Sequence, residues 1–253
     1  MMRDLPPPTR LTAGTVAPMR PAPVSFDALP PSRLARMAEA GARLIATARI
    51  LAKSGESIVA EMTGSEGRVH PYAHYPEGDV TDPESGARFF FHLHPMPMLG
   101  GDEGGLSGHF HCFLPAPDAA ARGLRKGSGL AHLVGVEVDR QGMPAQLFTT
   151  NRWVTDETWV PAGEAAKLLD RFVVELARPS LPAAIWITAI VQLFQPQIAA
   201  LLRARDAAIE ARRRQNRAAD PFEDQALEVP SAMEATVEGQ LASLRATLLP
   251  RAR

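Results

Sequence analysis

Cysteine is almost absent from this sequence, which has one thiol, Cys112, among 253 residues. A single cysteine cannot form an intramolecular disulfide, and its solitary presence fits a reducing compartment. Residues 1–8 also lack the apolar core of a secretory signal. We therefore expect a cytoplasmic protein.

Excess charge of either sign is absent as well. The formal net charge is −1, so the chain as a whole has no electrostatic attraction to nucleic acid or to an anionic membrane. The arginine-rich stretch at residues 212–217 has no interleaved aromatic residues that would stack on bases. We expect no nucleic-acid partner.

Long uncharged runs are rare, and the one that stands out is residues 181–202. Its 22 residues are enough to cross a membrane. Gln192, Gln195 and Gln197 interrupt the run, and Pro196 would kink a continuous helix. The segment is therefore expected to be a central buried helix, with no stable membrane span.

Proline is concentrated near the N-terminus. Residues 1–31 contain eight of the 23 prolines and little apolar periodicity, so we expect a disordered tail there. Residues 32–249 have the length and the apolar content of one domain. We place its sheet core at about residues 58–152, although residues 58–62 fit a helix equally, and its helical layer at about residues 161–249.

Strand-like and helix-like patterns follow one another along the domain. Apolar residues recur at helical intervals from Ser32, a suitable N-cap, to Gly55. The runs 132–138 and 145–150 flank a short turn and predict an antiparallel hairpin. Further amphipathic helices follow toward the C-terminus. The expected class is α+β: a small antiparallel sheet carrying a His-rich hairpin, packed with an N-terminal helix and a C-terminal helical layer.

The most distinctive part of the chain is a pair of short runs at residues 89–94 and 108–114. Each has a His-x-His pair in aromatic, β-prone surroundings. Residues 95–107 between them are too rich in Gly and Pro for a helix or a strand, and they predict a hairpin loop.

Strand geometry places each histidine pair on one face, because residues two apart on a strand project to the same side. His92 then shares a face with His94, and His109 shares a face with His111. A register that pairs His94 with His109 also pairs His92 with His111. That register brings all four imidazoles together.

Four imidazoles on one face of a sheet can converge on a metal ion. Strands lie roughly 4.8 Å apart, and an imidazole nitrogen binds a metal at about 2.1 Å. The predicted metal ligands are His92, His94, His109 and His111. Neutral imidazole suits zinc, iron and copper alike, so the expected cofactor is a divalent transition metal ion of one of these kinds.

The loop-like residues 64–86 supply candidates for the rest of such a site. His74 and Asp79 are predicted to complete the coordination shell or to act as general base, and are therefore the candidate catalytic residues. Asp79 and Asp82 are also candidates to donate an oxygen ligand or to orient an imidazole through its second nitrogen.

Other interpretations of the histidines stay open. All seven histidines lie between His70 and His132. Alternating His and Phe on a half-buried sheet can be hydrogen-bonded without any ligand, or can form a metal-free pocket for acid–base work or for an anion. Cys112 alternates away from His109 and His111 and is predicted to be a core residue.

Several short motifs are spread along the chain. They are His74-Tyr75-Pro76, Gly78-Asp79-Val80 with Asp82, the run ending in His92-x-His94, Gly108-His109-Phe110-His111, the segment 147–155 and the segment 193–198. Together they resemble an uncharacterised bacterial family of soluble proteins over roughly residues 32–249. The resemblance implies that His74, Asp79, His92, His94, His109 and His111 are motif positions, and it implies no activity. The Gly- and Met-rich insert between the two pairs is longer than we expect from the resemblance.

The function that we expect is that of a metal-dependent enzyme acting on a small molecule by hydrolytic or oxygen chemistry. A non-catalytic metal- or small-ligand-binding protein is the first alternative, since protein atoms can fill the whole coordination shell. A helical interaction module is the second. It predicts an exposed apolar stripe on residues 181–202, whereas the other two functions predict that this stripe is buried.

Overall fold

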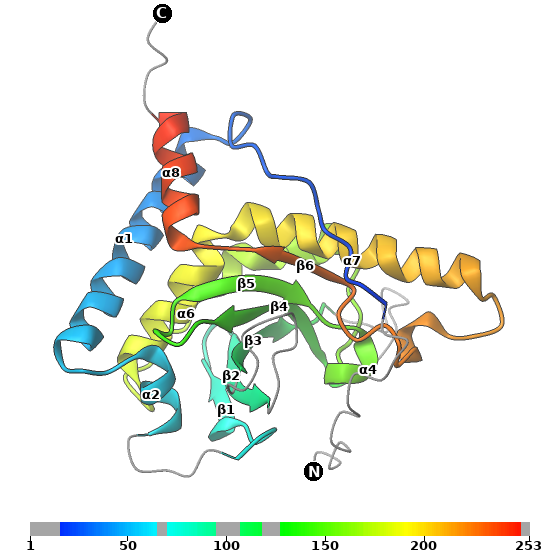
Figure 1. Cartoon of the computed structure of the whole chain (residues 1–253), viewed down its shortest axis with the longest axis horizontal. Coiled ribbons are helices and arrows are strands. Elements are labelled where there is room, and N and C mark those ends of the chain that lie inside the picture. The colour runs from blue at the N-terminus through cyan, green and yellow to red at the C-terminus, as the bar shows by residue number, and fades with distance from the viewer. Residues whose placement is uncertain (1–15, 65–69, 95–106, 118–126, 249–253) are drawn as a thin grey trace, which may run out of the picture.

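We describe the protein from a computed structural model, which defines residues 16–64, 70–94, 107–117 and 127–248 (Figure 1). Within this part of the chain, strands and helices form a mixed structure built on one antiparallel sheet, which confirms the α+β class. The predicted tail residues 1–15 lie outside the described residues.

The sheet has six strands in the described residues, and each strand pairs in antiparallel fashion with its neighbour in the order β1-β2-β3-β4-β5-β6. The strands are β1 (Tyr75–Thr81), β2 (Arg88–His94), β3 (Ser107–Pro115), β4 (Leu130–Val138), β5 (Pro144–Thr149) and β6 (Ser231–Glu234). Strands β2 to β5 follow the predicted hairpins. The β2 and β3 runs that carry histidines therefore lie inside the sheet, with a neighbouring strand on either side.

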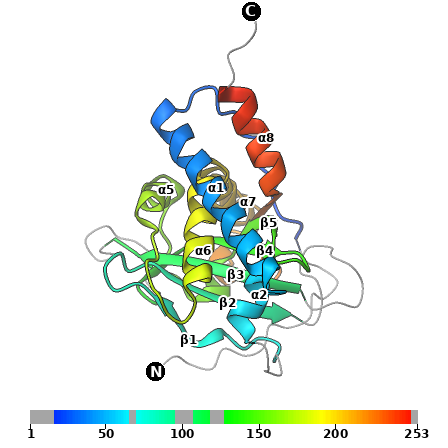
Figure 2. The same cartoon turned by 90° about the vertical axis from the view of Figure 1, so that its left-hand side faces the viewer.

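The helices pack mainly on one face of this sheet. They are α1 (Pro31–Lys53), α2 (Ile58–Thr63), α4 (Arg152–Thr155), α5 (Ala162–Leu168), α6 (Leu181–Leu193), α7 (Gln195–Gln215) and α8 (Val237–Leu248), with short 3-10 turns η1 (Leu169–Arg171) and η2 (Pro221–Glu223). Figure 2 shows α1 and α6 side by side, with α8 next to α1. The predicted N-terminal helix and C-terminal helical layer are both present.

Alternation along the strands separates two faces. We call the face that packs on the helices the core face. Phe91, Phe110 and Cys112 point to it and are fully buried in the main hydrophobic core, and the ring of Phe110 lies 5.1 Å from that of Trp186 in α6. Cys112 is the core residue that alternation predicts, and burial raises the pKa of its thiol.

The uncharged segment forms two helices rather than one. α6 and α7 meet at Phe194, one residue after α6 ends, and their axes bend by 70°, because a proline ring at Pro196 does not fit inside a helix that runs straight through. Among the described residues, no single helix is long and apolar enough to cross a membrane, although the bent pair meets the length and composition requirement together. Most apolar side chains of α6 are buried, as predicted for a central helix, and the stripe expected of an interaction module is not exposed there.

Two strands are not predicted from the sequence. β1 contains Pro76 and Gly78, and Asp79 has a φ of 60°, so the strand lacks the alternation that reveals a regular ladder. β6 has only four residues, directly after Pro230. Both lie at the ends of the strand order, where pairing to a single neighbour tolerates short or irregular strands.

Other element boundaries also differ from the expected ones. α1 begins at Pro31, with Pro30 as its N-cap in place of Ser32. Residues 58–63 form the helix α2, which resolves the open assignment there. α5 ends at Leu168 and is followed by the turn η1. The chain then becomes extended and contacts α6 through the Thr188 hydroxyl, which accepts the Val174 N–H at 2.9 Å.

Residues 16–30 do not form a free tail, which corrects that part of the predicted boundary at residue 32. Met19 forms a parallel bridge with Ser231 on β6, and Phe26 is buried in the main core. The segment thus covers the edge strand β6, whose unpaired backbone groups would otherwise face solvent. A few apolar anchors and edge hydrogen bonds are sufficient here, although the composition alone predicts disorder.

Asp82 has a structural role, and it does not reach the imidazoles as one hypothesis expected. Its carboxylate is buried and accepts three backbone N–H groups, each at 2.9 Å, from Glu84, Ser85 and Glu175. The hydrogen bond from Glu175 lowers the pKa of the Asp82 carboxyl most, followed by that from Ser85. Asp82 therefore ties the β1–β2 turn to the extended segment before α6.

The variant Asp82→Ala is expected to lose about 2–4 kcal/mol of unfolding free energy at neutral pH, because three backbone N–H groups lose a buried, charged acceptor. Since the pKa of Asp82 is lower in the folded state than its unfolded value of about 3.9, its contribution is present above that value and is lost as the pH falls through the folded pKa. Urea unfolding at pH 7 and at about pH 3 should show the difference from wild type shrink at the lower pH. Asp139→Ala, which removes an exposed turn aspartate with two backbone hydrogen bonds, is the control and should cost only about 1 kcal/mol.

Candidate metal centre

The β2–β3 hairpin pairs His92 with His109 and His94 with Ser107. The predicted register, in which His94 faces His109 and His92 faces His111, is therefore wrong by two residues. His111 instead faces Phe90. A slip of two residues keeps every side chain on its own face, so His92, His109 and His111 still share one face, which we call the imidazole face.

Packing on the opposite side explains the observed register. Phe91 pairs with Phe110, and their ring centroids lie 4.9 Å apart on the core face. Gly108 faces Leu93, and a Cβ placed at Gly108 would lie 2.3 Å from the Phe91 ring. The missing side chain thus makes room for the Phe91 ring, which the predicted register would set two residues further along β3.

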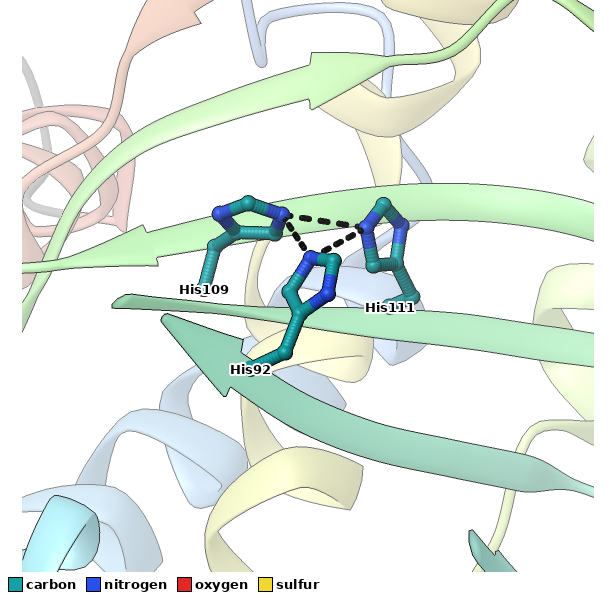
Figure 3. Close-up of side chains that lie close together, drawn as sticks. All are labelled: His92, His109 and His111. Carbon is teal, nitrogen blue, oxygen red and sulfur yellow. Dashed lines mark hydrogen bonds between the residues drawn. The ribbon is translucent and has the colours of Figure 1, made fainter. Parts of the chain in front are cut away.

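Three Nε2 atoms meet at one point on the imidazole face (Figure 3). The Nε2 of His92 lies 2.5 Å from that of His109 and 3.2 Å from that of His111, and the Nε2 atoms of His109 and His111 are 3.1 Å apart. His109 and His111 are each 2% exposed, and His92 is half-buried. Two neighbouring strands therefore deliver three of the four predicted ligands to one buried point.

These contacts cannot all be hydrogen bonds between neutral rings. A hydrogen bond between two imidazole nitrogens needs one protonated and one unprotonated atom. Among three mutually adjacent nitrogens, at least one pair must be alike. The arrangement becomes favourable when all three lone pairs face one cation.

The distances fit a cation as well. Nitrogens bonded at about 2.1 Å are about 3.0 Å apart at right angles and about 3.4 Å apart at tetrahedral angles. Two of the observed separations, 3.1 and 3.2 Å, fall in this range, and the third, 2.5 Å, requires His92 and His109 to move apart by about 0.5 Å. The three imidazoles can hold a metal ion.

Aromatic rings enclose the three histidines. Phe90 lies 5.1 Å from His111 and 5.5 Å from His92, and Phe148 lies 5.1 Å from His109, all measured between ring centroids. Gly135 on β4 leaves the space that Phe148 occupies, since a Cβ there would lie 2.3 Å from that ring. The surroundings are therefore apolar, which strengthens electrostatic attraction between the site and a cation.

A further histidine reaches this face through a β-bulge. Cys112 pairs with Val134, but Phe113 pairs with His132, so β4 has one extra residue at this point. Regular alternation would place His132 with Val134 on the core face. The bulge turns His132 to the imidazole face, where its Nε2 lies 3.0 Å from the Nδ1 of His111.

His132 is a site residue that the sequence does not predict. Regular alternation from Val134 would point it away from the other histidines. The available signal is its place in the cluster of all seven histidines, which says nothing about direction.

His132 is also held from its other sides. Its Nδ1 lies 3.1 Å from the Thr150 hydroxyl, and its backbone N–H donates to the Glu157 carboxylate at 3.0 Å. The ring is fully buried. Burial first, and then the positive charge of Arg205, lower the pKa of His132 to about 3, so the ring is neutral at physiological pH.

Behind His132 lies a buried ion pair. Arg205 in α7 and Glu157 are both fully buried, with Nη1 of Arg205 3.8 Å from Oε2 of Glu157. The guanidinium also donates to the Asp206 carboxylate at 2.8 and 3.0 Å and to the Val160 carbonyl at 2.6 Å, and it stacks 3.8 Å from the Trp159 ring centroid. Burial raises the pKa of the Glu157 carboxyl to about 7, against the lowering effects of Arg205 and of the His132 N–H.

The two predicted catalytic residues lie together beside the three histidines. The Nδ1 of His74 is 2.9 Å from the Asp79 carboxylate. The His74 ring stacks on Phe90 at 3.7 Å with an interplanar angle of 9°, and its centroid lies 5.9 Å from that of His92. The side chain of His74 is 39% exposed, so this pair connects the edge of the site with solvent.

The fourth predicted ligand, His94, is the last residue of β2, and its side chain lies outside the described residues. Met96, Met98, Asp102 and Glu103, which lie between β2 and β3 in the sequence, are also outside the described residues.

Comparison with protein families finds a match that covers residues 38–235. The matched family is described as "Domain of unknown function (DUF6969)". Comparisons with curated proteins and with solved structures found no match. The matched region contains all seven histidines and agrees with the resemblance seen over residues 32–249. The chain belongs to the family of this domain of unknown function, DUF6969.

Proposed function

We propose that the protein is a metal-dependent enzyme whose divalent transition metal ion is bound by His92, His109 and His111. The observation that carries the proposal is the meeting of three Nε2 atoms within 3.2 Å of one another in an apolar, largely buried place. Three neutral imidazoles suit zinc, iron or copper. His94 remains the proposed fourth ligand, because it lies two residues after His92 on β2 and alternation places the two on the same face.

Catalysis is favoured over simple metal storage by the pair His74–Asp79. The Asp79 carboxylate accepts a hydrogen bond from the Nδ1–H of His74 at 2.9 Å, which holds the imidazole in one orientation. Such a histidine, half-exposed beside the ligands, can accept a proton from a small molecule and pass it to solvent. A bound divalent metal would supply Lewis-acid chemistry.

The proposed reaction is hydrolytic or oxygen chemistry on a small-molecule substrate. Hydrolytic chemistry and oxygen chemistry both need a metal bound by about three protein atoms, with one coordination position open for water or substrate. A non-catalytic metal-binding protein is the second candidate. It would be favoured if His94 and a further protein atom complete the coordination shell and leave no exchangeable position.

Metal analysis of the native protein tests the proposal. The chain should be purified without chelator and without an affinity tag, and its metal content measured by plasma mass spectrometry. About one equivalent of zinc, iron or copper is expected. Metal contents near zero, both in the native protein and after refolding with each of these ions, would contradict the proposal. The three histidines would then form a cluster that binds no metal.

A further inference from the structure

The bulge in β4 places a fourth imidazole directly behind a metal ligand. His132 lies on the imidazole face only because β4 has one extra residue between its pairs with Cys112 and Phe113. Leu133 and Val134, which follow it, are both buried in the core. Bulges that re-aim a single side chain are over-represented next to active sites.

The contacts form a chain from the site to the protein interior. The Nδ1 of His111 lies 3.0 Å from the Nε2 of His132, and the Nδ1 of His132 lies 3.1 Å from the Thr150 hydroxyl. His132 and Thr150 are both 0% exposed. Each of the two rings therefore has a fixed partner at its second nitrogen.

This chain permits one proton arrangement when Nε2 of His111 is unprotonated. The proton of His111 is then on Nδ1 and is donated to Nε2 of His132. His132 in turn has its proton on Nδ1 and donates it to the Thr150 hydroxyl. The opposite direction of donation would put a proton on Nε2 of His111, where it would block a metal.

We propose that His132 is a positioning residue, which accepts the Nδ1–H of His111 and thereby keeps the Nε2 of His111 unprotonated and aimed at the point where the three histidines meet. Ligating histidines commonly donate their second N–H to a protein acceptor, and loss of that acceptor costs about 10- to 100-fold in metal affinity. The inference rests on the proposed metal centre, but the proton position on His111 can be measured without any metal.

The first test is nitrogen NMR of the metal-free wild-type protein with labelled histidine. The proton of His111 is expected on Nδ1. A proton on Nε2 of His111 would overturn the proposal, whether or not the protein binds metal. Failure of metal binding with the proton on Nδ1 would instead overturn only the proposed function.

The second test compares His132→Gln with His132→Phe by Zn²⁺ titration against a competing chelator. Glutamine supplies an amide oxygen that can accept a hydrogen bond near the position of Nε2, whereas phenylalanine supplies a ring of similar shape without an acceptor. His132→Phe is expected to bind Zn²⁺ about 10- to 100-fold more weakly, and His132→Gln should recover most of that loss. Equal affinities of wild type and His132→Phe would contradict the proposal.

A structural role alone predicts a different pattern. It predicts that both variants lose unfolding stability and that neither changes the proton position on His111. If His132→Phe does not fold, Thr150→Val removes the hydroxyl that orients His132 while keeping the side-chain shape. That variant is expected to lower Zn²⁺ affinity by a few-fold and to shift part of the His111 population to the Nε2–H form, and an unchanged His111 spectrum would contradict the proposal.

Discussion

The double substitution of His92 and His111 by glutamine is expected to lower the affinity for Zn²⁺ by at least about a thousandfold. A four-ligand zinc site supplies about 10–16 kcal/mol, or roughly 3 kcal/mol per ligand, and each 1.4 kcal/mol is about tenfold in affinity. Each of the two residues contributes one of the three Nε2 atoms that meet on the imidazole face. Isothermal titration or chelator competition measures the effect.

The metal-free double variant should still fold. The two histidines project from the imidazole face, and neither belongs to the main hydrophobic core, so we expect a loss of about 1–2 kcal/mol in unfolding free energy. His70→Gln is the matched control, because His70 is an exposed histidine outside the three-histidine cluster, and it should leave the affinity unchanged. Retention of one equivalent of Zn²⁺ at wild-type affinity by the double variant would show that other residues hold the metal.

Arg205→Met is expected to cause the largest loss of stability, about 3–5 kcal/mol, because it removes the positive partner of the buried Glu157 and of Asp206. The guanidinium is 0% exposed and also serves the Val160 carbonyl and the Trp159 ring. Arg213→Met on the same helix is the control. Arg213 pairs with Glu210 at a half-exposed position, so its loss should cost less than about 1 kcal/mol.

The loss in Arg205→Met should depend on pH. The pKa of Glu157 is already raised to about 7 by burial, and without Arg205 it rises further. A carboxyl with a raised folded-state pKa favours folding at low pH, and this contribution is lost as the pH rises from its unfolded value through the folded one. Chemical unfolding should therefore show a larger deficit at about pH 8.5 than at about pH 5.5. A second change, Glu157→Gln, should recover part of the deficit at the higher pH, and a deficit independent of pH would contradict this account.

The candidate site is largely predictable as a set of residues and not as a geometry. Alternation places His109 and His111 on one face and Cys112 on the other, and all three assignments are confirmed. The predicted register is wrong because the register depends on how Phe91 fits against Phe110 and Gly108 on the far side of the sheet. Sequence spacing contains no information on that contact.

The fold shows the same division. Strands and helices with regular periodicity, such as β3 and α1, are predictable because their patterns repeat over many residues. β1, β6 and the segment 16–30 are not, because short or irregular stretches are defined by the partner they pair with rather than by their own composition.

The sequence by itself determined which side chains share a face of the regular strands β2 and β3, since a period of two follows from local backbone geometry and does not depend on neighbouring strands. Tertiary structure alone decided that His92 meets His109 and that His132 joins them. Register and bulges are chosen by the packing of side chains from different strands, so the distances between the imidazoles are set by residues such as Phe91 and Val134 on the opposite face of the sheet.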